Sequence, residues 1–175
     1  MKKDISHLKS AKNKLSVMGY TVKDLAEDCI VCKDKRGNYV IMTENKDNRI
    51  ITSREYKSVD VIGKTGYCLV STDTGYSIIK LSEGLNIELE EYPEIRVDTI
   101  GNTGEYRLVV TLRNGYKGLT DLQGTILIPY VFVGIHLDKE GNRYVYNCNN
   151  YNTKQKYDIN GNRLETIKGN SYELI

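Results

Sequence analysis

The chain of 175 residues contains no tryptophan, one phenylalanine and only two prolines. This scarcity of proline argues against a Pro-rich disordered linker, and the 15 glycines favour many turns. No apolar run approaches the roughly 20 residues that a membrane span needs. The residues after Met1 also lack the apolar core of a signal peptide. A cytoplasmic protein is therefore expected, with its four cysteines as thiols.

Tyrosine supplies almost all of the aromatic content, with 14 residues. Its ring packs on half-buried strand surfaces while its hydroxyl reaches water, so this usage favours β-structure. The formal net charge of +2 is too small to indicate nucleic-acid binding by itself. The charge is unevenly distributed, however: residues 1–66 are basic and residues 67–104 carry two Lys or Arg against seven Asp or Glu.

The beginning of the chain has the spacing of an amphipathic helix. From Asp4 to Met18, apolar residues recur every three or four positions, and Gly19 follows as a stop signal. The helix is expected to cap one end of a repeat array, although a basic helix offered to a partner is an alternative. Residues 21–28 fit either a second short helix or a linker.

From Cys29 onward, short β-type runs are broken by glycine, asparagine and aspartate, and their layout recurs about every 38 residues. A first turn is predicted at Gly37, Gly75, Gly115 and Asn152. A second turn follows at Lys46, Gly84, Gly124 and Gly161. The same offset between the two turns in all four copies predicts tandem β-hairpin repeats.

The predicted fold is mainly β: about four tandem β-hairpin repeats with an N-terminal amphipathic α-helix. Residues 1–27 form the helical cap in this prediction. The repeats occupy residues 28–66, 67–104, 105–141 and 142–175, the last one truncated, within one continuous domain. The sequence leaves open whether the units stack in a line or close into a ring.

One copy, GYKGLTDLQGTILIPY, resembles a WG (or KWG) repeat, a β-hairpin module found in many bacterial proteins. The positions that match in kind are Gly115, Gly118, Leu119, Asp121, Gly124, Ile126, Ile128 and Pro129. Lys117 stands where the family has an aromatic residue, and the glycine after it survives only at Gly118. The resemblance implies an interaction surface rather than a particular chemistry.

No metal, cofactor or small-molecule substrate is predicted. Cys29 and Cys32 have CxxC spacing, but a zinc or redox site needs a second half, and neither another CxxC nor a His pair is present. The expectation is that Cys29, Cys32 and Cys68 are small buried strand residues.

No catalytic residues are predicted either. The carboxylates of Glu88 and Glu90 alternate as on a strand with one wet face, where nothing would perturb the pKa as general acid–base catalysis requires. A solvated face is therefore favoured over an enzymatic pair, and the chain is expected not to be an enzyme.

The predicted function is binding of another protein through a rigid β-repeat surface. The second repeat is acidic and could steer onto a basic partner. The residues proposed for this contact are Glu88, Glu90, Glu91, Tyr92 and Glu94. No membrane contact is expected.

Two alternatives remain open. An acidic scaffold with no active site is compatible with a phage or mobile-element inhibitor of a nucleic-acid-guided bacterial defence effector, similar in effect to an anti-CRISPR protein. The second alternative is direct nucleic-acid binding through the basic first repeat, where aromatic rings lie among cations. The residues for that contact would be Lys33, Lys35, Arg36, Tyr39 and Arg49.

Overall fold

The structure, a computed structural model, describes residues 12–26, 29–43, 50–52, 54–81, 87–88, 90–101, 103–137, 143–147 and 153–168. Residues 12–17 form a short helix, and the other regular elements are strands, so the expected mainly-β class is confirmed. The strands are β1 (Thr21–Ala26), β2 (Cys29–Lys33), β3 (Tyr39–Thr43), β4 (Ser58–Val61), β5 (Tyr67–Ser71), β6 (Tyr76–Lys80), β7 (Ile87–Glu88), β8 (Glu94–Ile100), β9 (Glu105–Thr111), β10 (Lys117–Thr120), β11 (Ile126–Phe132), β12 (Gly134–Leu137), β13 (Arg143–Asn147), β14 (Thr153–Asp158) and β15 (Arg163–Lys168).

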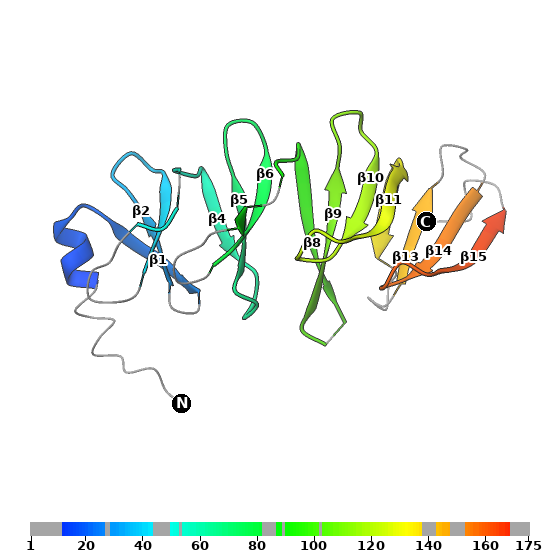
Figure 1. Cartoon of the computed structure of the whole chain (residues 1–175), viewed down its shortest axis with the longest axis horizontal. Coiled ribbons are helices and arrows are strands. Elements are labelled where there is room, and N and C mark those ends of the chain that lie inside the picture. The colour runs from blue at the N-terminus through cyan, green and yellow to red at the C-terminus, as the bar shows by residue number, and fades with distance from the viewer. Residues whose placement is uncertain are drawn as a thin grey trace. The chain divides into compact units, whose positions relative to one another are not determined.

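The described strands form four small antiparallel sheets in which strands that follow one another along the chain are neighbours (Figure 1). Sheet 1 is β1-β2-β3 and sheet 2 is β4-β5-β6-β7. Sheet 3 is β8-β9-β10-β11 and sheet 4 is β12-β13-β14-β15. The chain divides into two compact units: unit 1, Met1–Glu91, holds sheets 1 and 2, and unit 2, Tyr92–Ile175, holds sheets 3 and 4.

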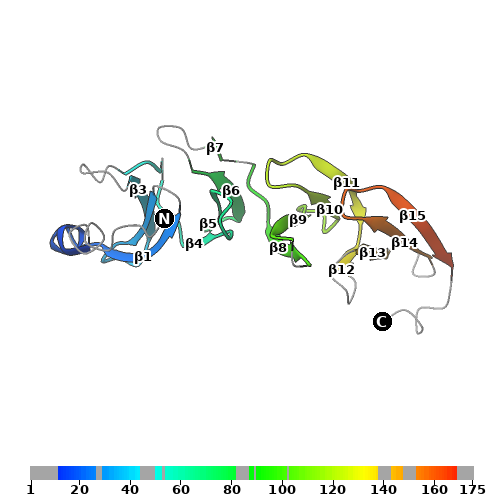
Figure 2. The same ribbon diagram turned by 90° about the horizontal axis from the view of Figure 1, so that it is seen from below.

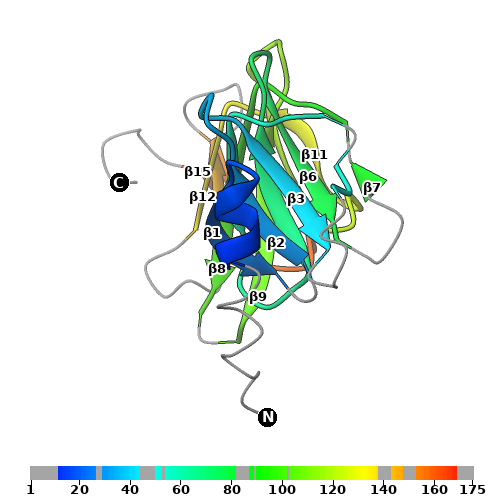
Figure 3. The same ribbon diagram turned by 90° about the vertical axis from the view of Figure 1, so that its left-hand side faces the viewer.

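In unit 1, sheet 1 lies between the N-terminal helix and sheet 2 (Figure 2) and packs apolar side chains on both of its faces. Because side chains alternate along a strand, β2 sends Cys29 and Val31 to a cluster shared with sheet 2, and Ile30 and Cys32 to the opposite face. The N-terminal helix lies over that opposite face (Figure 3). Its Leu15 side chain is fully buried there. Burial on two faces explains why β2 and β3 read as continuous apolar runs rather than as alternating ones.

In unit 2, a second apolar cluster joins sheets 3 and 4 and includes Leu119, Phe132 and Ile135. Two arginines of sheet 3 add polar contacts to sheet 4 and its turn. Arg107 Nε donates a hydrogen bond of 2.9 Å to the carbonyl of Ile159, and Arg96 Nη2 donates one of 3.1 Å to the carbonyl of Ile135. These side chains therefore link sheet 3 to the backbone of sheet 4 and of its last turn.

Three of the hairpin turns are built in the same way around an aspartate. Asp34, Asp121 and Asp158 each accept, at Oδ1, hydrogen bonds from the backbone amides two and four residues later. A glycine with positive φ follows three residues after each aspartate. The side chain therefore replaces backbone contacts within the turn, as Asx turns do.

The predicted turn glycines lie between paired strands. Gly37, Gly75 and Gly115 follow the second strand of sheets 1, 2 and 3, and Gly124 and Gly161 precede the last strand of sheets 3 and 4. Their assignment to hairpin turns is confirmed. The predicted turns at Lys46, Gly84 and Asn152 lie outside the described residues.

The sheets are out of phase with the sequence repeats by one strand. The repeat at residues 67–104 contains β5, β6 and β7, but its last strand, β8, is the first strand of the next sheet. The same offset holds for β4 and β12. Each of the first three predicted repeats therefore shares its strands between two sheets.

The N-terminal cap differs from its prediction. Residues 12–17 are helical and Leu15 is buried as expected, whereas Met18, expected on the same apolar face, is 53% exposed. Gly19, at a φ of 89°, ends the helix as predicted. Residues 4–11 lie outside the described residues.

The prediction for the segment after the helix is wrong. The sequence places residues 21–27 in the helical cap and predicts either a second short helix or a linker for residues 21–28. Thr21–Ala26 is strand β1 and pairs with β2. Its register shifts between Val22 and Asp24, and this irregularity removes the period of two by which a strand is recognised in a sequence.

Two turn glycines of unit 2 form a matched pair for testing the sheet packing. Gly115 and Gly161 have φ of 84° and 87°, so alanine is strained at both, at a cost of about 1 kcal/mol. A Cβ at Gly115 would meet nothing within 4 Å, whereas one at Gly161 would overlap the carbonyl of Leu127 on β11. Urea denaturation should show that Gly161→Ala lowers the free energy of unfolding by at least about 1 kcal/mol more than Gly115→Ala. Equal losses would contradict the close approach of this turn to β11.

Candidate functional site

The acidic segment predicted to bind a partner lies at the end of unit 1 and the start of unit 2. Glu88 is the last residue of β7, and its side chain lies outside the described residues. Glu90 is exposed. The three remaining candidates, Glu91, Tyr92 and Glu94, make contacts within their own units.

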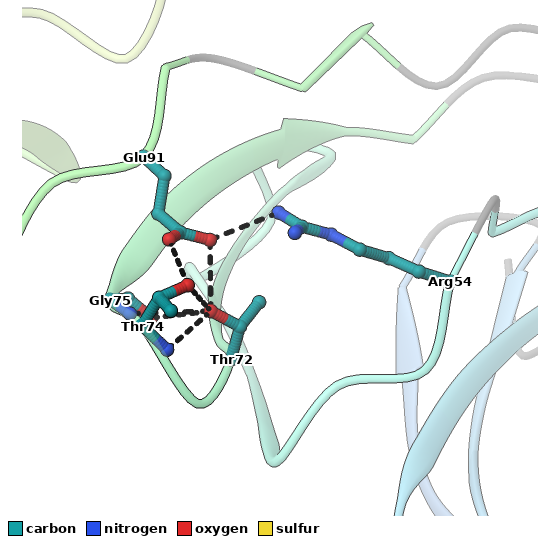
Figure 4. A network of polar contacts seen from close by, with 5 residues as sticks. All are labelled: Arg54, Thr72, Thr74, Gly75 and Glu91. Atoms are coloured by element: carbon teal, nitrogen blue, oxygen red, sulfur yellow. Dashed lines mark hydrogen bonds and ion pairs between the residues drawn. The ribbon is translucent and has the colours of Figure 1, made fainter.

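The Glu91 carboxylate binds the turn between β5 and β6 (Figure 4). The hydroxyl of Thr74 donates to Oε1, and the hydroxyl of Thr72 donates to Oε2 over 2.8 Å. Arg54 Nη2 also donates to Oε2, over 3.3 Å. The Thr72 hydroxyl in turn accepts hydrogen bonds from the backbone amides of Thr74 and Gly75. Glu91 therefore fixes the last residue of unit 1 to a hairpin turn.

These contacts set the protonation of Glu91. The hydrogen bonds from Thr74 and Thr72, followed by the positive charge of Arg54, hold the pKa of Glu91 below its usual value. The carboxylate is thus ionised at neutral pH, and it already accepts hydrogen bonds from side chains of its own unit. A general acid would need a raised pKa, so the direction of this shift is opposite to the one that acid catalysis requires.

Glu94 occupies a similar position in unit 2. Three residues lie side by side on neighbouring strands of sheet 3: Glu94 on β8 pairs with Thr111 on β9, and Thr111 pairs with Lys117 on β10. Lys117 Nζ donates to Glu94 Oε2 over 2.9 Å, and the Thr111 hydroxyl donates to the same oxygen over 2.8 Å. The hydrogen bond from Lys117, then that from Thr111, lowers the pKa of Glu94. Lys117, which replaces the aromatic residue of the WG pattern, therefore serves as an ion-pair partner within the sheet.

Tyr92, the aromatic member of the predicted acidic site, packs inside unit 2. Its ring stacks on that of Tyr130 with 6.4 Å between the ring centroids and 30° between the planes. The ring of Tyr130 lies over Gly118, where a Cβ would overlap the ring and approach the Ile128 carbonyl to 2.8 Å. The glycine that resembles the WG pattern is thus required by an aromatic contact.

Of the residues proposed for nucleic-acid binding, Lys33 and Tyr39 lie in sheet 1, where the ring of Tyr39 is already in contact with a cation. Lys33 Nζ lies 5.2 Å from the ring centroid of Tyr39, which is half-buried. The neighbouring Tyr56 is 2% exposed and is covered by Arg54. Two further cations of this set, Lys35 and Arg36, are exposed in the turn between β2 and β3, and Arg49 lies outside the described residues.

The cysteines of the CxxC spacing lie on opposite faces of β2, since residues three apart on a strand point in opposite directions. They therefore do not converge on one metal ion or form a redox pair. Cys29, Cys32 and Cys68 are buried strand residues, as predicted. Burial raises the pKa of Cys32 to about 11 and is the largest cause that raises the pKa of Cys68 to about 12.

The surface that the sequence analysis did not single out is strand β11. Exposed aliphatic side chains lie along it and just after it: Ile126 is 56% exposed, Val131 51% and Val133 44%. Pro129, between them, is exposed as well. A signal for this surface was present in the sequence, because no Asp, Glu, Lys or Arg occurs from Leu122 to Leu137 in a chain with 27% charged residues.

No family model and no curated protein sequence matches the chain. Solved structures that it resembles include Hsv2 of Kluyveromyces lactis, with a TM-score of 0.45 at 12% identity over 86% of this chain and 52% of that one. The β-propeller domain of Cps50 (Swd1) of Myceliophteria thermophila gives 0.34 at 7% identity over 81% of this chain and 56% of that one. The periplasmic gluconolactonase PpgL of Pseudomonas aeruginosa gives 0.37 at 8% identity over 87% and 55%.

The chain spans about half the length of the solved structures that it resembles. Among the residues with described structure, no helix has the length and apolarity to cross a membrane.

Replacing Glu91 by glutamine tests the contacts of the β5–β6 turn. Because the pKa of Glu91 is lowered in the folded state, its contribution to stability is present above its usual pKa and is lost as the pH falls through the lowered value. Urea denaturation should therefore show Glu91→Gln less stable than wild type at neutral pH, with the difference shrinking in acid. Glu90→Gln, at an exposed position, is the control and should match wild type. A difference that is independent of pH would contradict the role of the ionised carboxylate.

The buried thiols should be unreactive in the folded protein. At about pH 8 a thiol with a raised pKa is almost entirely protonated, and the thiolate is the reactive form. Brief treatment with iodoacetamide should leave Cys32 and Cys68 unmodified, while the same treatment in urea should alkylate both, as measured by mass spectrometry of the digested protein. Rapid alkylation of either residue in the native protein would show that the strand cores open readily.

Proposed function

We propose that this protein is a non-catalytic binding module for another protein, built from tandem small antiparallel β-sheets, and that the partner binds along β11 of unit 2. The observation that carries the proposal is the row of exposed aliphatic side chains Ile126, Val131 and Val133. Single exposed apolar residues are ordinary on protein surfaces, whereas several of them along one uncharged segment favour an interaction site. The resemblance to the WG repeat, a module associated with interaction surfaces, supports the same proposal.

The charges of the described structure favour β11 over the acidic segment as the main contact. Glu91 and Glu94 each have a cationic partner within their own unit: Arg54 pairs with Glu91 and Lys117 pairs with Glu94. Threonine hydroxyl groups donate further hydrogen bonds to both carboxylates. Pairing within the protein reduces the field that these carboxylates project onto an approaching partner. A contribution of exposed Glu90 to steering fits the proposal, but burial of the aliphatic row provides the affinity.

Two valines form a matched pair for testing this surface. Val131 lies on β11 and is 51% exposed, and Val17 lies in the N-terminal helix and is 89% exposed. Glutamate at either position should leave folding intact, because substitutions at exposed positions usually change stability by less than about 0.5 kcal/mol. Affinity capture with quantitative mass spectrometry should recover a defined protein with wild type and with Val17→Glu, and should lose it with Val131→Glu.

Nuclease treatment of the same samples separates this proposal from nucleic-acid binding. A partner that contacts the aliphatic row directly should remain bound after nuclease. Loss of the partner on nuclease treatment, or its equal recovery with all three proteins, would contradict the assignment of the surface. A variant with Lys35 and Arg36 replaced by alanine provides the complementary arm and should retain the partner.

A further inference from the structure

Asparagine is followed by glycine at two positions of the sequence, Asn114–Gly115 and Asn160–Gly161, and both pairs lie in hairpin turns of unit 2. The first turn joins β9 to β10 (Figure 1) and the second joins β14 to β15. Both asparagines are exposed, and the two glycines have positive φ values of 84° and 87°. The same chemical groups are therefore present in two turns whose surroundings differ.

An Asn–Gly pair contains both a nucleophile and an electrophile. The backbone nitrogen of the glycine, once its proton has passed to a base in solution, can attack the side-chain carbonyl carbon of the asparagine. A bond forms between these two atoms, the bond from Cγ to Nδ2 breaks, and the amide nitrogen leaves as ammonia. Water then opens the five-membered imide at either carbonyl and gives aspartate or isoaspartate. The sequence of steps involves no oxidation or reduction, and glycine favours it because no Cβ obstructs the closing ring.

The turn at Asn114 holds these groups in an arrangement that favours the attack. The backbone amide of Tyr116 donates a hydrogen bond of 3.1 Å to Asn114 Oδ1. Negative charge develops on this oxygen when the nitrogen attacks, so a donor that is already in place stabilises the intermediate. A Cβ at Gly115 would meet no described atom within 4 Å, and the backbone there has room to move as the ring forms.

The turn at Asn160 is ordered by more hydrogen bonds. Asp158 Oδ1 accepts one of 2.9 Å from the backbone amide of Asn160 and one of 2.8 Å from that of Asn162. Asn162 Nδ2 also donates to Asp158 Oδ2 over 2.8 Å. These bonds fix the conformation of the turn on both sides of the Asn160–Gly161 peptide.

Packing against sheet 3 restrains the same turn further. Gly161 lies against the backbone carbonyl of Leu127 on β11. Arg107 Nη2 of β9 lies 3.5 Å from Asn160 Oδ1 and would also stabilise negative charge on that oxygen. The ring closes, however, only if the peptide plane between Asn160 and Gly161 turns, and the contact with Leu127 opposes this movement. The packed turn is therefore expected to react more slowly.

We propose that Asn114 is a site of spontaneous covalent modification in the folded protein: Gly115 N attacks Asn114 Cγ, ammonia leaves, and hydrolysis yields isoaspartate or aspartate, whereas the packing of the second turn protects Asn160. The product carries a carboxylate in place of a neutral amide, three residues before Lys117, which pairs with Phe132 of β11. Isoaspartate also adds a methylene group to the backbone of the turn. This inference is independent of the proposed function.

Incubation of the whole protein in a mildly basic buffer tests the proposal. Digestion with pepsin in acid, followed by chromatography and mass spectrometry, measures aspartate and isoaspartate at each position. In the folded protein Asn114 should convert at least about tenfold faster than Asn160, a ratio that corresponds to about 1.4 kcal/mol in the free energy of activation. In urea the two asparagines should convert at similar rates, because the unfolded chain gives both pairs the same freedom.

Asp158→Ala tests the protection of the second turn, since it removes the hydrogen bonds that order Asn160 and Asn162. It should accelerate conversion of Asn160 and leave that of Asn114 unchanged, with circular dichroism confirming that the sheets persist. If this variant unfolds, the comparison of the two sites in the wild type decides alone. Equal rates at the two sites of the folded wild type, or conversion of Asn114 only after urea is added, would overturn the proposal.

Discussion

Face-to-face packing of small antiparallel sheets is the interaction on which the rest of the structure depends. In unit 1 the cluster around Val31 and Cys68 joins sheet 1 to sheet 2, and in unit 2 the cluster around Leu119 and Phe132 joins sheet 3 to sheet 4. Packing of this kind hides sheet faces and leaves edges and turns as the surfaces that meet solvent. A function for this chain is therefore to be sought along strand edges and at turns.

Several polar residues at the turns form hydrogen bonds that stabilise the backbone of the turns themselves. Asp34, Asp121 and Asp158 order hairpins, and Glu91 joins the end of unit 1 to the β5–β6 turn. The acidic character of the second repeat, which in sequence suggests an interaction surface, is thus partly structural. The side chain of Val131 on β11, by contrast, is exposed and belongs to neither a turn nor the core. This difference favours β11 as the binding surface.

The turns could be predicted from sequence because their determinants are local. An aspartate followed by a glycine three residues later specifies the turn in sheets 1, 3 and 4 without help from distant residues. Strand β1 could not be predicted with the same ease, since it depends on pairing with β2 and on an irregular register. The opposite faces of Cys29 and Cys32 followed from strand geometry once β2 was assigned.

The candidate site was harder to predict because it depends on contacts between residues far apart in sequence. Glu91 meets Thr72 and Arg54, 19 and 37 positions away, and nothing in the local sequence identifies such donors. The uncharged stretch from Leu122 to Leu137 is visible in the sequence, but its meaning depends on the sheet order that leaves β11 at an edge. The lack of charge in this segment can be read from the sequence, whereas its exposure follows only from the order of the strands in the sheet.

Site-specific photo-cross-linking in living cells tests the central claim most directly. A photoreactive amino acid placed at position 131 samples the edge of β11, and the same amino acid at position 17 samples an exposed aliphatic site of unit 1. The account predicts a discrete, nuclease-resistant protein adduct from position 131 and none from position 17. An adduct formed equally from both positions, or one formed from position 90 in the acidic segment and not from position 131, would contradict it.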